Sequence, residues 1–308
     1  MSVSPLQEVT VGVADLQARR SQFESGLGLT TVSSGPVTST TAWRLFDLPS
    51  PNQAAVLGVE SFLGVPRIRL AEAPGFPPAR PHGPGAPGPL GLGFVARGVP
   101  ALCARLQRSD VRFLSAPATG DRAASSGAAH GGNLEAIGQT LDGDFLLLSE
   151  AAEPSAGPGG DGSEPRNVAF IVTNLDASLH FMRDVLEKDS DLLEAGSRSP
   201  FAALLAIGGD SRIRVALPRL SEGATGGVMF VEFEKRLTPP PQFSAFGRGV
   251  CRLRYDTTDL HETLARVPGG GGSLVRGPSG IDDPVLGRGL VALVRAPFGI
   301  VIELWQTA

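Results

Sequence analysis

Runs in which apolar and polar residues alternate recur along the chain, and each is followed by a segment with helical spacing. Residues 9–16 (VTVGVADL) and 168–175 (VAFIVTNL) place large apolar side chains at alternate positions. This period of two predicts half-buried strands, and the Asp or Asn near the end of each run is a good helix N-cap. Helices are therefore expected at residues 16–26 and 176–186.

Further strands repeat the pattern in the other parts of the chain. Residues 66–71 (PRIRLA) and 211–216 (SRIRVA) form a second matched pair, again with a period of two. The remaining quarters predict strands followed by helices, at residues 90–95 and 99–108 and at residues 250–255 and 260–266. The repetition predicts an α+β fold of four βαβββ modules, paired into two curved mixed-sheet half-barrel domains that each enclose a cleft.

A segment without large apolar residues divides the chain near its middle. Residues 153–165 are rich in Gly, Pro and Ser, and such a stretch gains too little burial to offset the entropy of ordering. We expect an N-terminal domain at 1–153, a linker at 154–165 and a C-terminal domain at 166–308. The modules are expected at about 1–75, 88–153, 166–220 and 226–308.

The composition of the chain argues against several classes of function. The 308 residues carry a formal net charge of −4, so no basic surface for nucleic acid is expected. No apolar run reaches the length of a membrane helix, and no secretory leader is seen at the N-terminus. Two cysteines are too few for a disulfide framework. These features favour a cytoplasmic protein that interacts with neither nucleic acid nor membrane.

Several motifs follow one another in the order that is typical of a known superfamily. They are residues 8–16 (EVTVGVADL), 22–29 (QFESGLGL), 140–145 (TLDGDF), 181–186 (FMRDVL) and 296–304 (APFGIVIEL). The set resembles the vicinal oxygen chelate superfamily of glyoxalases, bleomycin-resistance proteins and extradiol dioxygenases. The resemblance implies a cleft lined by the first and last strands of two modules. It also implies a divalent metal, held there by His and Glu, that binds two substrate oxygens.

Strand alternation allows the implied metal positions to be tested. Side chains two residues apart share a face, which places these residues at the ligand positions: Glu8, Leu90, Asn167 and Val250 on first strands, and Arg69, Leu147, Arg214 and Glu303 on last strands. None is a histidine, and Glu303 alone keeps the carboxylate expected on a last strand, so no metal cofactor is expected. If the first and fourth modules share a cleft, Glu8 and Glu303 could instead hold Mg²⁺ or Mn²⁺ with waters. The sequence leaves the pairing of the modules open.

Arginines dominate the predicted cleft positions. Arginine binds carboxylate or phosphate through its planar fork, and a buried guanidinium needs an anionic partner. The predicted substrate-binding residues are Arg67, Arg69, Arg212, Arg214, Arg252, Arg254, Asn167, Phe94 and Trp305. The alternative is that these arginines are solvated or paired with the protein's own carboxylates, and that the aromatic residues are ordinary core.

The predicted ligand is a small anionic or oxygenated organic molecule. Glu8, Glu303 and His130 are the candidate catalytic residues, with His130 in a Gly-rich segment as a possible general base. The chain is expected to be a metal-free lyase or isomerase, or a dioxygenase-like protein. The alternative is a non-catalytic protein that sequesters a small molecule, as resistance proteins do. A homodimer is a further expectation.

Overall fold

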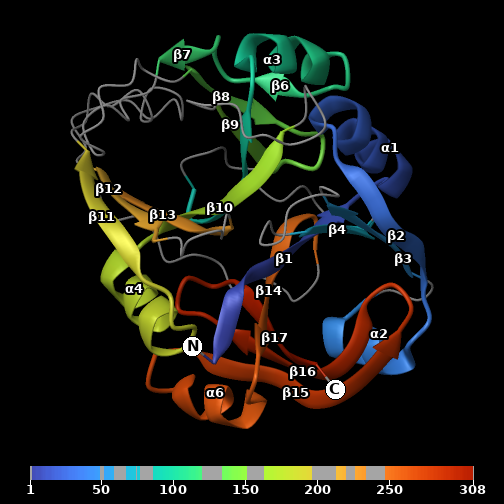
Figure 1. Ribbon diagram of the computed structural model, residues 1–308, viewed down its shortest axis with the longest axis vertical. Coiled ribbons are helices and arrows are strands. Elements are labelled where there is room, and N and C mark those ends of the chain that lie inside the picture. The colour runs from blue at the N-terminus through green and yellow to red at the C-terminus, as the bar shows by residue number, and fades with distance from the viewer. Residues whose placement is uncertain are drawn as a thin grey trace.

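The computed structural model describes residues 2–48, 52–58, 67–73, 75–76, 86–119, 134–150, 163–195, 213–219, 226–233 and 247–307. Within these residues the chain forms two large mixed sheets. Their central strands cross the middle of the molecule, while helices α1, α3, α4 and α6 lie around the rim (Figure 1). The α+β fold of paired half-barrels is thereby confirmed. No helix in the described part of the chain is long and apolar enough to cross a membrane.

The first sheet combines the first and fourth modules. The first module comprises β1 (Val3–Val13), α1 (Leu16–Ser21), a π-helical turn (Gln22–Gly26), β2 (Thr30–Val37), α2 (Thr40–Phe46), β3 (Asn52–Gly58) and β4 (Arg67–Glu72). The fourth comprises β14 (Gly249–Thr257), α6 (Leu260–Arg266), β15 (Ser273–Asp283), β16 (Gly287–Arg295) and β17 (Val301–Thr307). The strand order is β15-β16-β17-β14-β1-β4-β3-β2.

The second sheet combines the second and third modules. The second module comprises β5 (Gly88–Ala96), α3 (Val99–Gln107), β6 (Arg112–Phe113), β7 (Ala118–Thr119), β8 (Leu134–Gln139) and β9 (Phe145–Glu150). The third comprises β10 (Glu164–Val172), α4 (Leu175–Asp184), β11 (Ser190–Ala195), β12 (Ile213–Pro218) and β13 (Gly227–Phe233). The strand order is β11-β12-β13-β10-β5-β9-β8-β6, and β7 pairs with β8.

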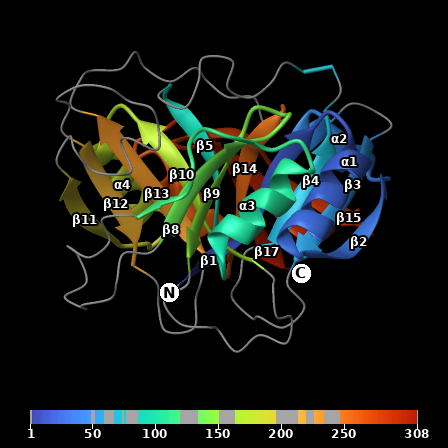
Figure 2. The same ribbon diagram turned by 90° about the horizontal axis from the view of Figure 1, so that it is seen from above.

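Each sheet therefore joins strands from both halves of the sequence. Antiparallel pairing of β1 with β14, and of β5 with β10, makes the connection in the centre of each sheet. Of the predicted linker 154–165, only residues 163–165 are among the described residues. The third module extends past its predicted end at 220, because β13 is the strand that lies beside β10. The outer strands β11 and β2 lie at opposite ends of the molecule (Figure 2).

The helices begin where the sequence predicts. Asp15 and Asn174 have extended backbone, and their side chains accept hydrogen bonds from the backbone N–H groups three residues later, at Ala18 and Ala177. This contact satisfies one of the free N–H groups at a helix start. The first helix changes to a π-helical turn after Ser21 and reaches Gly26, so the expected span of 16–26 is helical throughout.

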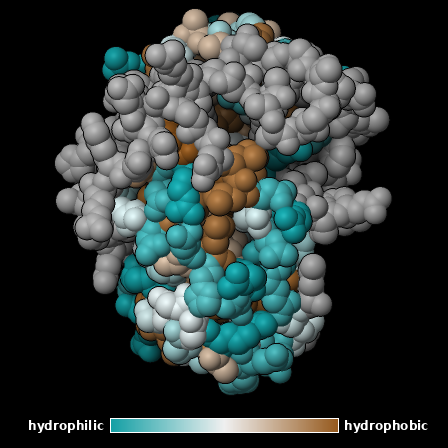
Figure 3. All heavy atoms as spheres, turned by 90° about the vertical axis from the view of Figure 1, so that its left-hand side faces the viewer, coloured by the Kyte–Doolittle hydropathy of each residue, from teal (hydrophilic) through white to brown (hydrophobic). Residues whose placement is uncertain are grey.

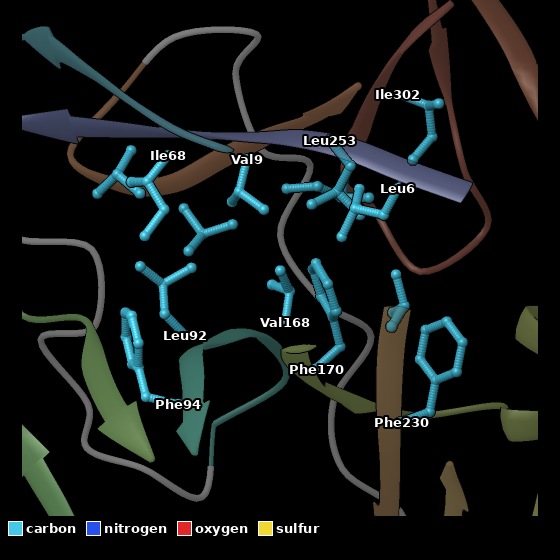
Figure 4. Packing of buried hydrophobic residues seen from close by; sticks show 14 of the residues in the cluster. Leu6, Val9, Ile68, Leu92, Phe94, Val168, Phe170, Phe230, Leu253 and Ile302 are labelled. Carbon is cyan, nitrogen blue, oxygen red and sulfur yellow. The ribbon is translucent and has the colours of Figure 1, made fainter. Parts of the chain in front are cut away.

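A hydrophobic core lies between the two sheets and extends under the helices. Figure 4 shows part of it, with side chains from both sheets facing one another: Leu6, Val9, Ile68, Leu92, Phe94, Val168, Phe170, Phe230, Leu253 and Ile302. Phe94 belongs to this core, and its ring meets that of Phe23 edge-on with 6.3 Å between centroids. The prediction that Phe94 lines a cleft is therefore wrong.

A bulge in β5 explains this error, and β14 has an equivalent bulge. The pairing of β5 with β10 shifts by one residue at Leu90, and that of β14 with β1 shifts at Cys251. An extra residue in a strand reverses the faces of the side chains on one side of it. Leu90 thus faces the inner side of its sheet, whereas Leu92 and Phe94 face the core between the sheets.

A buried polar cluster fixes α1 against the turn between β8 and β9. The Nη2 atom of Arg19 lies 2.8 Å from Asp142 Oδ2 and 2.7 Å from Asp144 Oδ1. Arg248 reaches the other oxygen of Asp142 at 2.9 Å. Since Arg19 and Arg248 flank the first sheet and both aspartates belong to the second, these charge-assisted contacts hold the sheets together.

Candidate functional site

In the first sheet, an approximate twofold relation connects the two modules. Glu8 of β1 lies opposite Arg254 of β14, and Thr10 lies opposite Arg252. A twofold rotation between the two strands exchanges these two pairs. Glu8 in the first module therefore corresponds to Arg252 in the fourth, and Thr10 corresponds to Arg254. The predicted first-strand position Val250 is therefore wrong, because the bulge at Cys251 turns Val250 toward the core, while Arg252 lies on the inner face as predicted.

The last strands of these two modules obey the same relation. Parallel pairing places Arg69 of β4 beside Thr10, and Glu303 of β17 beside Arg254. Arg69 and Glu303 consequently occupy equivalent places. Four equivalent positions thus converge on the inner side of the first sheet, and we call them the Glu/Arg quartet: Glu8, Arg69, Arg252 and Glu303.

The Glu/Arg quartet is a buried set of ion pairs. Arg69 Nη2 pairs with Glu8 Oε1, and Arg69 Nη1 lies 3.3 Å from Glu303 Oε1. Arg252 Nε lies 3.2 Å from Glu303 Oε2. Glu8 is 5% exposed and the other three side chains are at most 1% exposed, so the pairs are shielded from water. Two carboxylates and two guanidinium groups balance in charge.

Aromatic side chains close the Glu/Arg quartet. Phe46, at the end of α2, lies with its ring 4.2 Å from the guanidinium carbon of Arg252. Trp305 donates a hydrogen bond from Nε1 to Glu303 Oε1, and its ring lies 4.1 Å from the guanidinium carbon of Arg254. Both rings belong to an apolar cluster that joins α2 to β15, β16 and β17. Trp305 lies on this face, as predicted, and its polar contacts are with Glu303 and Arg254.

The two carboxylates of the Glu/Arg quartet differ in their proton affinity. Burial raises the pKa of Glu8, and this effect exceeds the lowering by the charge of Arg69. Burial also tends to raise the pKa of Glu303, but the charges of Arg69 and Arg252 outweigh it and hold that pKa below its ordinary value. Glu303 is accordingly the firmly ionised member.

The donor set does not fit a divalent metal. Among the described residues, no group of three or more His, Cys, Asp or Glu side chains could hold an ion. Glu8 and Glu303 share one face, as the Mg²⁺ or Mn²⁺ alternative requires, yet the guanidinium of Arg69 lies between them. A cation at that place would be repelled by Arg69 and Arg252.

The inner face of the second sheet has a different character. Gly93 lies opposite Asn167, and Gly91 opposite Ala169, while Leu147 lies beside Gly93 and Met229 beside Ala169. By the same twofold relation the four equivalent positions are Gly91, Leu147, Asn167 and Met229. The bulge therefore moves the predicted position Leu90 to Gly91. Met229 replaces Arg214 because β13, rather than β12, borders β10.

Apolar residues surround these four positions, and we call the whole set the second inner face. It consists of Asn167 and the cluster Leu90, Ile137, Phe145, Leu147, Ala169, Ile171, Ile213, Met229, Val231 and Phe233. Leu147, Met229 and Phe233 keep exposed fractions of 8%, 7% and 6%, so water reaches part of this face. On the side where β11 and β12 lie, hydrophobic surface forms a strip between hydrophilic areas (Figure 3).

Asn167 is the polar member of the second inner face. Its Oδ1 atom is buried and accepts no hydrogen bond from the described part of the chain. A Cβ atom at position 93 would lie 1.9 Å from this oxygen, so Gly93 provides the space that the amide occupies. The prediction that Asn167 faces the inner side of the sheet agrees with this position.

The other predicted site residues are dispersed. Arg214 lies on the outer side of β12, where it pairs with Asp176 at 2.6 Å and Glu232 at 2.9 Å, so its predicted place in a cleft is wrong. Arg67 is exposed at the start of β4, whereas Arg254 remains beside the Glu/Arg quartet, where it contacts the ring of Trp305 and pairs with Asp256 at 3.0 Å. His130 and Arg212 lie outside the described residues.

Sequence reasoning missed Phe46 and Met229 at these faces. The apolar run at residues 227–233 could have identified the last strand of the third module, and with it Met229. Nothing in the sequence of α2 indicates that this helix lies over the inner side of the first sheet. Its place becomes visible only when the cluster with Trp305 is formed.

Solved structures resemble this chain over nearly its whole length. Glyoxalase I from Zea mays matches with a TM-score of 0.67 at 15% identity, covering 98% of this chain and 92% of that protein. A putative dioxygenase from Bacillus subtilis matches with a TM-score of 0.60 at 14% identity, covering 99% of this chain and 86% of that protein. No protein-family model and no curated protein matches the chain. At such low identity the likeness shows the fold.

Proposed function

The chain has the vicinal oxygen chelate fold, as its sequence resemblance implied, and on this premise we propose that it binds a small neutral organic molecule without a metal. The proposed site is the second inner face. The ligand is mainly apolar and carries one hydrogen-bond donor. The observation that carries the proposal is the buried Oδ1 atom of Asn167, which accepts no hydrogen bond from the described residues around it.

The chemistry of the second inner face supports this ligand class. Small-molecule sites are commonly apolar, with few polar groups that fix orientation. Leaving a buried acceptor unsatisfied costs about 1–3 kcal/mol, and a ligand donor at Asn167 would recover that cost. The same cost would penalise a ligand of equal shape that lacks the donor. Asn167 thus acts as the selecting group and the apolar cluster supplies most of the affinity.

The charge arrangement favours a neutral ligand over an anionic one. Arg69 and Arg252 are neutralised by Glu8 and Glu303, so they have little attraction left for an anion. Arg214 pairs on the opposite side of its strand. The non-catalytic, sequestering function is therefore our first proposal, and the anionic substrate expected from the arginines becomes the less favoured one.

Three probes of the same shape test the proposal. p-Cresol, p-xylene and p-toluate carry a donor, a methyl group and a carboxylate on one ring, and their binding can be measured by calorimetry. We expect p-cresol to bind about tenfold more tightly than p-xylene, and p-toluate to bind least. In Asn167→Leu this preference for p-cresol should vanish. The control Asn174→Asp changes an amide that caps α4 and should keep it.

Tryptophan fluorescence locates the probe. The chain has two tryptophans, Trp43 and Trp305, and both belong to the cluster on the first sheet. A ligand on the second inner face should raise the unfolding temperature and leave tryptophan emission unchanged. Strong quenching by bound p-cresol, or tightest binding by p-toluate, would contradict the proposed site.

One observation favours a second candidate, a lyase or isomerase acting on an oxygenated organic acid. Burial raises the pKa of Glu8, and perturbed pKa values are frequent among carboxyl groups that exchange protons with a substrate. In this case Glu8 removes a proton from the carbon next to a carbonyl and later returns one. Exchange of that proton for deuterium from solvent, followed by NMR on a panel of hydroxy and keto acids, tests it. Exchange should stop in Glu8→Gln and persist in Asn167→Leu.

A further inference from the structure

The Glu/Arg quartet occupies first-strand and last-strand positions at which the family resemblance implies a metal ion. We infer that Arg69 and Arg252 together replace a divalent cation in both place and charge, so that the first sheet has an internal substitute for a metal centre. The inference concerns the first sheet alone and does not depend on the ligand proposed for the second inner face.

The charges support the replacement. Two buried carboxylates, Glu8 and Glu303, require two positive charges nearby, because an uncompensated buried charge is costly. A divalent ion would supply both charges at one point, whereas two guanidinium groups supply them at the ends of two side chains. The quartet has no excess charge in either case. This balance of charge explains why two carboxylates persist beside the apolar cluster that joins α2 to β15, β16 and β17.

The ion pairs between the two modules also support the replacement of a metal ion. Each module contributes one carboxylate and one guanidinium, Glu8 with Arg69 from the first and Glu303 with Arg252 from the fourth. Because Glu8 corresponds to Arg252 and Arg69 to Glu303, acid and base have exchanged places between the modules. Glu303 receives Arg69 from the first module at 3.3 Å and Arg252 from its own at 3.2 Å. The quartet thus links β4 to β17, as a shared metal ion would.

The inference predicts that a variant without the two arginines binds a metal ion at the quartet positions. Arg69→Gln with Arg252→His removes both guanidinium groups and leaves two carboxylates, an amide and an imidazole at the four positions. These are ligand types that first-row divalent metals accept. We expect this double variant to bind Ni²⁺ and Mn²⁺ at least tenfold more tightly than the unaltered protein. Its unfolding temperature should rise with Ni²⁺ and fall again with a chelator.

A matched double variant controls for other effects of removing the arginines. Arg69→Met with Arg252→Met adds no metal ligand, so Ni²⁺ should leave its unfolding temperature unchanged. The inference fails if the Gln/His variant folds and binds Ni²⁺ no more tightly than the unaltered protein. It also fails if the unaltered protein itself takes up one Mn²⁺ per chain at the Glu/Arg quartet.

Folding of the variants decides the remaining cases. If the Gln/His variant is unfolded alone, refolding upon addition of Ni²⁺ supports the inference, and failure to refold while the Met/Met variant folds overturns it. If neither folds, the single variant Arg252→His retains Arg69 to balance one carboxylate. A rise in its unfolding temperature with Ni²⁺ then supports the inference, and the absence of any rise overturns it.

Discussion

Glu303→Gln removes one charge from the Glu/Arg quartet while it keeps the shape of the side chain. Glu303 is 0% exposed, and its two oxygens face Arg69 and Arg252. The amide leaves Glu8 as the one quartet carboxylate for two buried guanidinium groups. The substitution therefore tests whether charge balance, rather than packing, holds this part of the first sheet together.

The expected loss is large for a single isosteric change. Breaking a buried ion pair by removing one partner costs about 3–5 kcal/mol, because the remaining charge is left uncompensated. The hydrogen bond from Trp305 Nε1 is retained by the amide oxygen of Gln, so it does not add to the loss. A cost near 4 kcal/mol is a substantial part of the roughly 5–15 kcal/mol that stabilises an ordinary domain.

Urea unfolding followed by tryptophan fluorescence measures the loss, since Trp305 lies against the quartet. The control is Asp191→Asn, which breaks the ion pair with Arg219 at 2.5 Å on the surface. That pair is more than half exposed, and exposed pairs contribute about 1 kcal/mol or less. Equal losses in the free energy of unfolding for the two variants would refute the reasoning, because a buried ion pair would then contribute no more than an exposed one.

Three further changes follow from the same geometry. Glu8→Gln should lower the free energy of unfolding by less than Glu303→Gln does. Because the pKa of Glu8 is raised in the folded protein, stability should fall as the pH rises from 4.5 through that folded pKa. Urea unfolding at a series of pH values should show that this fall in stability is missing in Glu8→Gln. Gly12→Ala should destabilise by about 3 kcal/mol in thermal unfolding, because its Cβ would lie 1.7 Å from the backbone oxygen of Gly247. Arg214→Met should change the free energy of unfolding by no more than about 1 kcal/mol, since the ion pairs of Arg214 with Asp176 and Glu232 are partly exposed.

The four modules could be predicted from the sequence because their signals are local. Strand alternation and capping residues act within ten or so residues, and Asp15 and Asn174 cap helices as expected. The pairing of modules could not be predicted in this way. Val9 and Val168 would be buried against a neighbouring module in either arrangement, so the hydrophobic pattern is the same for both. The choice depends on which strand edges meet, and β1 meets β14.

Each first strand has a bulge directly before its inner-face position, so a position was predicted correctly where alternation was counted from residues after the bulge and wrongly where it was counted across it; the bulges lie at Gln7, Leu90, Arg166 and Cys251. Glu8, Asn167 and Glu303 lie on the inner faces as alternation requires. Leu90 and Cys251 each add one residue to a strand, so the residues on the two sides of the bulge no longer alternate regularly, and Leu92, Phe94 and Val250 face the core instead of the inner side. A bulge has no strong local sequence signal, because it is stabilised by pairing with a distant strand. Errors of one residue in a first strand are the expected consequence.

The contrast between the two inner faces indicates how one fold can separate stability from binding. In the first sheet, α2 brings Phe46 onto Arg252, and the two carboxylates of the quartet balance the charge of its two guanidinium groups. In the second sheet, the equivalent positions carry two apolar side chains, a glycine and Asn167, which leaves one buried acceptor unsatisfied. The unsatisfied amide, rather than the cluster of arginines that dominates the sequence, is therefore the group around which a binding function is best sought.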